Sequence, residues 1–312
     1  MNLNMLNKSN LLVILLFLMG EICGSVKAAS GGENEYRIEK QLLFEGYKRF
    51  YLINLPPNYY ELNNLPLVIA LHGGGGKSSQ CEKDYKLTET ADKNGYVIVY
   101  PDGVQSDGLL KVRTWNAGTC CDYAAEQNIN DVGFISLIID EMIKNYKVDS
   151  KRVYVTGMSN GAMMAYKLAC EIPWKIAAIA AVSGTMLTGN ACSPTLPVPI
   201  LHIHSICDKK VPVTGGIGIR GYYFPPVDSV LKVWTILDLC NYNKPNIQEF
   251  ENYTKYQWQN NNKEIFVEYY LTKDGGHAWP GGKKGNIFAD KPSKAIKANK
   301  IIFEFFKNHH QN

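Results

Sequence analysis

The stretch Gly157–Gly161 (GMSNG) joins two segments of different periodicity. The residues before it, Arg152–Thr156, are mostly β-branched or aromatic, as in a buried strand. The residues after it, Ala162–Cys170, form an apolar helical run that Pro173 ends. A strand, a sharp turn and a helix in this order predict one unit of an α/β fold.

Five further short segments have the composition of buried strands. They are Leu67–Leu71, Tyr96–Tyr100, Ile176–Val182, Pro199–His204 and Phe266–Leu271. Most are nearly continuous apolar runs, which is typical of strands buried on both faces of a parallel sheet. Apolar residues recur at three-to-four spacing in Val132–Tyr146, with Asp131 as the expected N-cap, and in Ser293–Phe306. We therefore predict an α/β fold with a mostly parallel central sheet flanked by helices.

The first 29 residues predict a secretory signal peptide. Lys8 precedes the apolar run Leu11–Met19, and residues 26–28 (VKA) resemble a cleavage site. The alternatives are an uncleaved membrane anchor, for which the run is short, and a lipoprotein signal at Cys23. We expect a secreted protein, extracellular or periplasmic, with one domain over residues 30–312 and no stable membrane insertion after cleavage.

Charge and cysteine content restrict the possible partners and cofactors. The net charge is +4, and Lys and Arg are scattered along the chain, so we expect no nucleic-acid partner. After Cys23 seven cysteines remain; some should pair in an oxidising compartment, and in a monomer at least one stays free. Their spacing matches no zinc site, so we expect no metal and no cofactor.

Ser159 has the sequence and the setting of a nucleophile elbow, in which a serine is exposed at the carboxyl end of a strand. A serine hydroxyl needs a base to act as a nucleophile. His277 lies in a glycine-rich loop after the strand Phe266–Leu271, where such a fold presents its base. The other histidines of the mature chain are expected in a strand, before a glycine run or in a fraying tail: His202, His204, His72, His309 and His310.

Asp208 is the expected acid of a Ser–Asp–His triad, because the acid lies between the serine and the histidine in chains with this elbow. It closely follows the strand Pro199–His204. Its role would be to orient the imidazole and to stabilise the imidazolium. Other carboxylates compete from a predicted helix or from the loop of the histidine itself: Asp228, Asp238 and Asp274.

Backbone N–H groups are expected to stabilise the charge that acyl transfer builds on a carbonyl oxygen. One donor is the amide of Asn160, directly after the serine. The other comes from the glycine run His72–Gly76, with Gly74 and Gly75 as candidates. This run lacks the Gly-Lys-Ser/Thr ending of a phosphate-binding loop.

Together these motifs resemble the secreted poly(3-hydroxybutyrate) depolymerase-like and feruloyl or acetylxylan esterases, that is, carbohydrate esterase family 1 and its relatives. The blocks that carry the resemblance are LHGGGG (71–76), VYPDG (99–103), WNAGTCC (115–121), NDVGF (130–134), GMSNGAMMAYKLAC (157–170), Cys192 before PVPILHIH, Asp208 with VPVTGG (211–216), Trp234 with Cys240, and GGHAWPGG (275–282). The resemblance implies an α/β-hydrolase fold, no metal cofactor, and a triad of Ser159, Asp208 and His277. Residues 204–208 (HSICD) depart from the His-Gly-Thr-x-Asp of relatives, which bears on efficiency more than on identity.

The expected function is that of a secreted serine carboxylesterase that forms an acyl-enzyme. Trp115, Trp279 and residues 222–226 (YYFPP) are candidates for a hydrophobic wall around the acyl group, with packing as the alternative. Relatives that attack solid polyester usually add a binding module after the core domain, so we expect small or oligomeric ester substrates. A serine peptidase or thioesterase on the same fold, and an inactive binding protein, are the alternatives.

Overall fold

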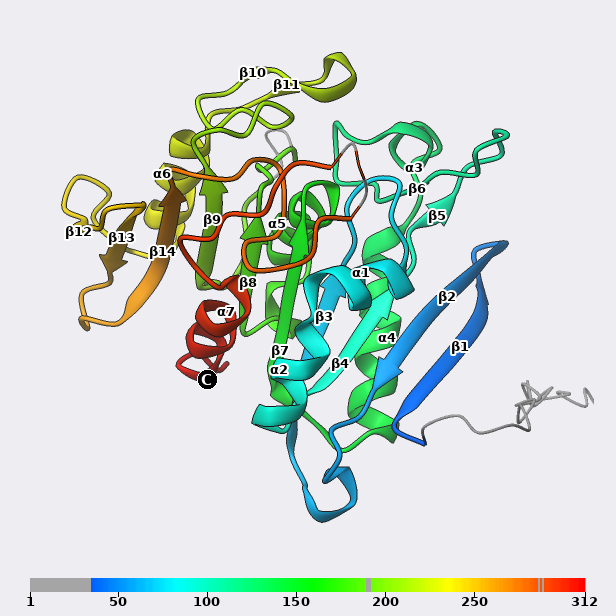
Figure 1. Ribbon diagram of the computed structural model, residues 1–312. Helices are drawn as coiled ribbons and strands as arrows, with labels where there is room; N and C mark the ends of the chain where they lie inside the picture. The colour runs from blue at the N-terminus through cyan, green and yellow to red at the C-terminus, as the bar shows by residue number, and fades with distance from the viewer. Residues whose placement is uncertain (1–34, 189–191, 286, 288, 312) are drawn as a thin grey trace, which may run out of the picture. The chain divides into compact units, whose positions relative to one another are not determined.

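The six apolar segments predicted as strands form the centre of one sheet in the computed structural model, which describes residues 35–311 except 189–191, 286 and 288 (Figure 1). They are β3 (Leu65–Leu71), β4 (Val97–Pro101), β7 (Val148–Met158), β8 (Ala178–Val182), β9 (Ile200–Ser205) and β14 (Ile265–Thr272). All six run parallel, and every residue of β3, β4, β8 and β9 is buried. Burial on both faces explains their continuous apolar sequences.

Four strands that the sequence did not predict extend the sheet at its two ends. They are β1 (Arg37–Phe44), β2 (Tyr47–Asn54), β12 (Asn246–Glu249) and β13 (Tyr253–Gln259), and the full order is β1-β2-β4-β3-β7-β8-β9-β14-β13-β12. All four pair antiparallel with their neighbours. Every residue of β12 is exposed and β1 carries exposed residues along its length, so their hydrophobic pattern is weak.

Helices cover both faces of the sheet, and successive residues of one strand pack against different helices (Figure 1). Ile69 of β3 belongs to the hydrophobic cluster that contains residues of α4 (Asp131–Asn145), α5 (Asn160–Glu171) and α6 (Val227–Leu237). Val68 belongs to the cluster with α1 (Ser78–Tyr85), α2 (Leu87–Asn94) and α7 (Ala298–Lys307). The predicted architecture, a mostly parallel sheet between two layers of helices, is confirmed.

Two helix boundaries differ from the prediction. The N-cap of α4 is Asn130 and not Asp131, because the Asn130 side chain accepts the N–H of Gly133 at 2.9 Å. The last helix begins at Ala298 and not at Ser293, whose hydroxyl instead donates to Asp274.

Shorter elements connect the main ones. They are α3 (Asp122–Glu126), the 3-10 turns Tyr59–Glu61, Pro173–Lys175 and Ile219–Gly221, and the paired strands β5 (Val104–Gln105) with β6 (Arg113–Thr114) and β10 (Gly216–Ile217) with β11 (Tyr223–Phe224). Figure 1 shows β10 and β11 beyond the carboxyl ends of the parallel strands.

Cysteine pairing follows the prediction in outline. Cys170 is bonded to Cys192, and the neighbours Cys120 and Cys121 are bonded to each other. Three cysteines of the described residues are free, namely Cys81, Cys207 and Cys240. The predicted fraying tail is wrong for His309, whose ring nitrogens bond to Phe305 O and Ile265 O.

The predicted signal peptide, residues 1–29, lies outside the described residues. Within residues 35–311, gaps excepted, no helix is both long enough and apolar enough to cross a bilayer.

Candidate active site

The loops that carry the predicted site residues leave the same edge of the sheet. His72 follows β3, Ser159 follows β7, Asp208 follows β9 and His277 follows β14. Because these strands are parallel, their carboxyl ends lie at one edge. The topology therefore brings together residues that are far apart in the sequence.

The turn at Ser159 has a backbone conformation that residues with a side chain rarely adopt. Its φ is 55° and its ψ is −123°, and its N–H donates to Val182 O on β8 at 2.9 Å. A Cβ on Gly157 would lie 2.6 Å from the backbone of Gly161, and one on Gly161 would lie 2.6 Å from His72 O. The two glycines thus allow the start of α5 to pack against the end of β3, as a nucleophile elbow requires.

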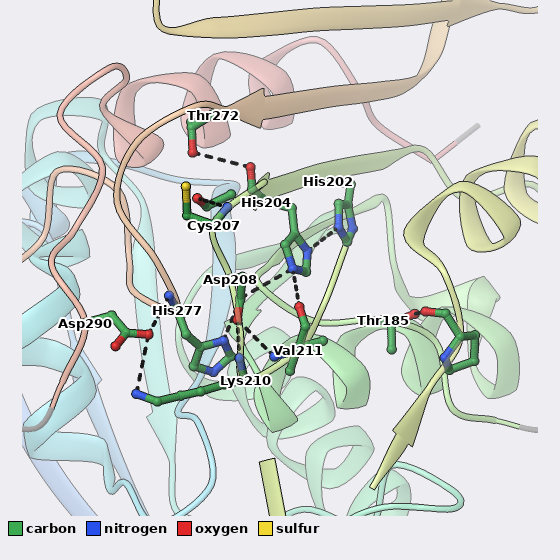
Figure 2. A network of polar contacts seen from close by, with 12 residues as sticks. Thr185, His202, His204, Cys207, Asp208, Lys210, Val211, Thr272, His277 and Asp290 are labelled. Carbon is green, nitrogen blue, oxygen red and sulfur yellow. Dashed lines mark hydrogen bonds and ion pairs between the residues drawn. The ribbon is translucent and has the colours of Figure 1, made fainter. Parts of the chain in front are cut away.

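His277 and Asp208 form a direct hydrogen bond, with 2.7 Å between Nδ1 and Oδ2 (Figure 2). The other carboxylate oxygen, Oδ1, accepts the backbone N–H groups of Lys210 and Val211, each at 2.9 Å. With Nδ1 facing the carboxylate, Nε2 is the ring nitrogen left for a reacting group. Among the described residues, neither this Nε2 nor Ser159 Oγ has a hydrogen-bond partner, and both residues line the same pocket.

Behind Asp208, a row of buried polar side chains continues into the core (Figure 2). Nε2 of His204 lies 3.4 Å from Asp208 Oδ2, and His204 Nδ1 lies 3.1 Å from His202 Nε2. His202 Nδ1 lies 2.7 Å from the hydroxyl of Tyr166 on α5. Burial alone would raise the pKa of the Asp208 carboxyl, but hydrogen bonds from His204 and His277 lower this pKa well below its ordinary value.

A second connection joins the loops of Asp208 and His277. The backbone N–H of His277 donates to Asp290 Oδ2 at 2.9 Å, and Nζ of Lys210 lies 3.5 Å from the same oxygen (Figure 2). Both charged side chains are about a third exposed, at 31% and 36%, so the pair adds little stability. Its effect is to fix the His277 loop relative to the acid.

The two candidate regions for an oxyanion site are neighbours. A Cβ built on Gly74 would lie 3.8 Å from the Cβ of Asn160. The backbone N–H groups of Gly74 and Asn160 have no acceptor among the described residues. The N–H of Gly75, in contrast, donates to Arg113 O at 2.8 Å, so of the two candidates in the glycine run the structure favours Gly74.

These groups line a pocket of about 600 Å³, a volume typical of small-molecule sites. Apolar lining comes from α5 and the segment 211–224, namely Met163, Val211, Ile219, Tyr222 and Phe224. Polar lining comes mainly from α1 and the segment 283–290, namely Gln80, Asp84, Lys283 and Asp290. The separation is partial, because the segment 211–224 also supplies Arg220 and α1 also supplies Tyr85.

Comparison with known protein families identifies the family of this chain. Residues 49–239 match the family model described as esterase PHB depolymerase. The chain belongs to the esterase PHB depolymerase family. The matched stretch includes Ser159 and Asp208, while the loop of His277 follows it.

Two curated relatives of this esterase-family chain are longer proteins. It is 32% identical over 219 residues to the bifunctional acetylxylan esterase/xylanase XynS20E of Neocallimastix patriciarum. The aligned residues cover 69% of this chain and 29% of that protein. It is 27% identical over 242 residues to feruloyl esterase B of Piromyces equi. Here the aligned residues cover 75% of this chain and 43% of that protein. The chain thus spans less than half the length of these two relatives.

A solved structure has a fold similar to that of this esterase-family chain. The acetyl xylan esterase from Aspergillus awamori superposes with a TM-score of 0.62, covering 87% of this chain and 99% of that one, at 18% identity. This likeness confirms the predicted α/β-hydrolase fold.

The aromatic residues predicted as pocket walls have different positions in this esterase-family fold. Trp115 is fully buried and is absent from the pocket lining, so the prediction is wrong for this residue. Trp279 does line the pocket and stacks on Tyr85, with 4.3 Å between ring centroids. Tyr222 and Phe224, from the predicted 222–226 segment, also line it.

The other candidates for the acid of the triad have different hydrogen-bond partners in this esterase-family chain. Asp228 accepts from a nearby tyrosine hydroxyl, Asp274 accepts from Ser293, and Asp238 accepts the N–H of Val198 at 3.0 Å. None of the three lines the pocket. Among the residues that the structure describes, no group of three or more His, Cys, Asp or Glu is arranged to hold a metal ion.

The contact of His204 with Asp208 was not predicted from the sequence, because both histidines were expected only as residues within a strand. A signal was present in the sequence. His202 and His204 are two residues apart on β9, so they share one face of the strand, and the strand ends shortly before Asp208. A polar pair at that position is able to reach the next loop.

Proposed function

We propose that the protein hydrolyses carboxylic esters with Ser159 as nucleophile, His277 as general base and Asp208 as the residue that orients the base. The observation that carries the proposal is the 2.7 Å hydrogen bond between His277 and Asp208 beside the pocket that Ser159 also lines. Membership of an esterase family supports the same reaction class.

The reaction would proceed in two steps through an acyl-enzyme. Ser159 Oγ attacks the ester carbonyl carbon while His277 Nε2 takes the hydroxyl proton. His277 then returns this proton to the alcohol oxygen as the carbon–oxygen bond of the ester breaks. In the second step water attacks the acyl-serine, again losing its proton to His277, and the acid product and free serine are released.

The oxyanion formed in each step would be stabilised by the backbone N–H groups of Asn160 and Gly74. Each such donor typically contributes about 3–4 kcal/mol to the transition state in acyl-transfer enzymes. The absence of another acceptor for these two groups among the described residues supports this assignment.

The substrate would be an ester with a short or aromatic acyl group. The acyl group would contact the apolar side chains of Met163, Tyr222 and Phe224, and the alcohol would face the polar side of the pocket with Asp84 and Lys283. Relatives named acetylxylan esterase and feruloyl esterase support polyhydroxybutyrate depolymerase-like or acetylxylan and feruloyl esterase-like substrates.

Export is part of the proposal. The apolar run Leu11–Met19 with a following cleavage site supports a signal peptide. The two disulfides support an oxidising compartment, extracellular or periplasmic.

The test compares residues 30–312 with Ser159→Ala on p-nitrophenyl acetate, p-nitrophenyl butyrate and methyl ferulate. We expect kcat to fall at least about 10³-fold in the variant. Ser229→Ala is the matched control and should keep full activity, because this serine is exposed on α6 and its hydroxyl bonds, among the described residues, only to Pro226 O. Equal turnover by wild type and Ser159→Ala contradicts the proposal, and thioester and amide analogues in the same panel test the alternative reactions.

A further inference from the structure

The side chain of Asn160 is paired with the backbone of Trp115. The N–H of Trp115 donates to Asn160 Oδ1 at 2.7 Å, and Asn160 Nδ2 donates to Trp115 O at 3.0 Å. Both residues are buried, at 2% and 0% exposure. The two bonds are antiparallel, like those between two strands, so the Asn160 side chain is fixed at the first position of α5.

The side chain of Trp115 makes a separate bond to the other half of the proposed oxyanion site. Its indole N–H donates to His72 O at 2.9 Å, directly before the glycine run. The His72 ring continues this connection, with Nδ1 at 2.7 Å from Gly73 O and Nε2 accepting the N–H of Gly103 at 2.9 Å. Burial lowers the pKa of His72 to about 4, so the ring is neutral and can keep both bonds at neutral pH.

The segment around Trp115 is itself anchored in the core. Cys121 N–H donates to Trp115 O at 3.2 Å, and Asn160 Nδ2 lies 3.3 Å from Cys121 Sγ. The next residue, Asn116, donates its N–H to Asp131 at 2.8 Å, and Asp131 forms a buried ion pair with Arg49. Trp115 therefore cannot move without breaking bonds to several elements.

We propose that Trp115 and the Asn160 side chain are positioning residues that hold the two oxyanion donors, Gly74 N–H and Asn160 N–H, at a fixed separation. The proposal rests on the function proposed above. Oxyanion stabilisation requires donors that are in place before the charge develops. These two donors belong to different segments of the chain. Trp115 is hydrogen-bonded to both segments, through its backbone to the Asn160 side chain and through its indole to His72 O, directly before the glycine run.

The test is Trp115→Phe, which removes the indole N–H but keeps an aromatic ring in the core. We expect kcat for p-nitrophenyl butyrate to fall about 10- to 100-fold, less than for loss of a whole donor, with KM changed less than about twofold. Phenylboronic acid forms a tetrahedral adduct with a serine hydroxyl and places an oxygen in the oxyanion site. Its affinity should fall by the same factor as kcat/KM, which a general loss of folded protein would not produce.

Trp234→Phe is the matched control. Trp234 is also fully buried, but its indole N–H has no hydrogen-bond partner among the described residues, so the same substitution breaks no hydrogen bond there. We expect its kcat and boronate affinity to stay within about twofold of wild type. Titration of the reactive serine with a fluorophosphonate normalises all rates to active enzyme.

A second variant keeps the proposal testable if Trp115→Phe folds poorly. Asn160→Ala retains the backbone N–H but loses the pairing with Trp115, and it should show the same parallel loss of kcat and boronate affinity. The double variant should lose less than the product of the two single effects, because both act through one connection.

Unchanged kcat in both single variants, a rise in KM alone, or a fall in kcat without a fall in boronate affinity would overturn the positioning role. Retained turnover in Ser159→Ala would instead overturn the proposed function, whatever Trp115→Phe does.

Discussion

The Asp208 carboxylate accepts hydrogen bonds from two backbone N–H groups and from the His277 ring. His204 Nε2 lies 2.9 Å from Val211 O and 3.4 Å from Asp208, so this nitrogen carries the proton. With the single ring proton of His204 on Nε2, His204 Nδ1 accepts from His202 Nε2, and His202 Nδ1 accepts from the Tyr166 hydroxyl. Burial, and then the neighbouring His204, lower the pKa of His202 well below its ordinary value, which favours this arrangement. The row of donors keeps Asp208 ionised in a buried position.

Asp208→Asn replaces one carboxylate oxygen by an NH₂ group that faces donors. We expect kcat to fall about 10⁴-fold, as for the amide replacement of the acid in serine proteases, because the base loses its preferred tautomer. Asp228→Asn is the control, since this carboxylate has a tyrosine partner and does not line the pocket. The ester assay should show no loss for it; an equal loss in the two variants would contradict the assignment of the acid.

A comparison of wild type with Asp208→Asn also tests the lowered pKa of Asp208. A carboxyl whose pKa is lower in the folded than in the unfolded chain stabilises the fold at pH values above its unfolded pKa of about 4. This contribution is lost as the pH falls below that value toward the folded-state pKa. Urea unfolding should therefore show a difference in free energy between wild type and Asp208→Asn that is constant near neutral pH and shrinks below about pH 4. A difference independent of pH would be inconsistent with the lowered pKa.

Among the elements, those buried on both sides were predicted well and those at the margins poorly. The sequence located β7, α5 and the turn between them because their apolar runs are continuous and bounded by glycines. It did not locate the hairpin of β1 and β2, whose stability depends on pairing with β4. Strand pairing between distant segments leaves little local trace in a sequence.

The cap of α4 gives a prediction for this helix. Asn130→Ala should lower the free energy of unfolding by about 1 kcal/mol, because the first turn loses the acceptor of Gly133 N–H. Asn130→Ser keeps a capping oxygen but cannot reach Glu45, which Asn130 Nδ2 contacts at 2.7 Å. Urea unfolding of the serine variant should show most of the stability retained; an equal loss in both variants would assign the cost to the Glu45 contact.

For the molecule as a whole, the topology explains how much of the site was predictable. Once the strands are parallel, the residues that follow them must meet at one edge, so Ser159, Asp208 and His277, the residues of the proposed triad, were predicted from their order and their strands. The role of Trp115 was not, since its burial and its bond to His72 depend on packing between distant segments. For the same reason the sequence did not distinguish Gly74 from Gly75.

The Cys170–Cys192 disulfide stabilises the whole domain by restricting the unfolded chain. It joins the end of α5 to the segment before β9 across a sequence separation of 22 residues. Replacing both cysteines by alanine should lower the free energy of unfolding by about 3 kcal/mol, measured in urea. Reductant should destabilise wild type by a comparable amount and change the variant far less, because the Cys120–Cys121 bond closes almost no loop. An unchanged unfolding free energy in the variant would show that this link does not constrain the unfolded chain.

The separation of sheet and loops has a consequence for the evolution of specificity. Part of the apolar wall of the pocket comes from the segment 211–224, which includes the short strands β10 and β11 and lies outside the ten-stranded sheet. Under the proposed function, substitutions there would change which acyl groups fit without disturbing the strands that precede Ser159, Asp208 and His277. Proteins that share this scaffold can therefore diverge in substrate specificity while they retain one reaction.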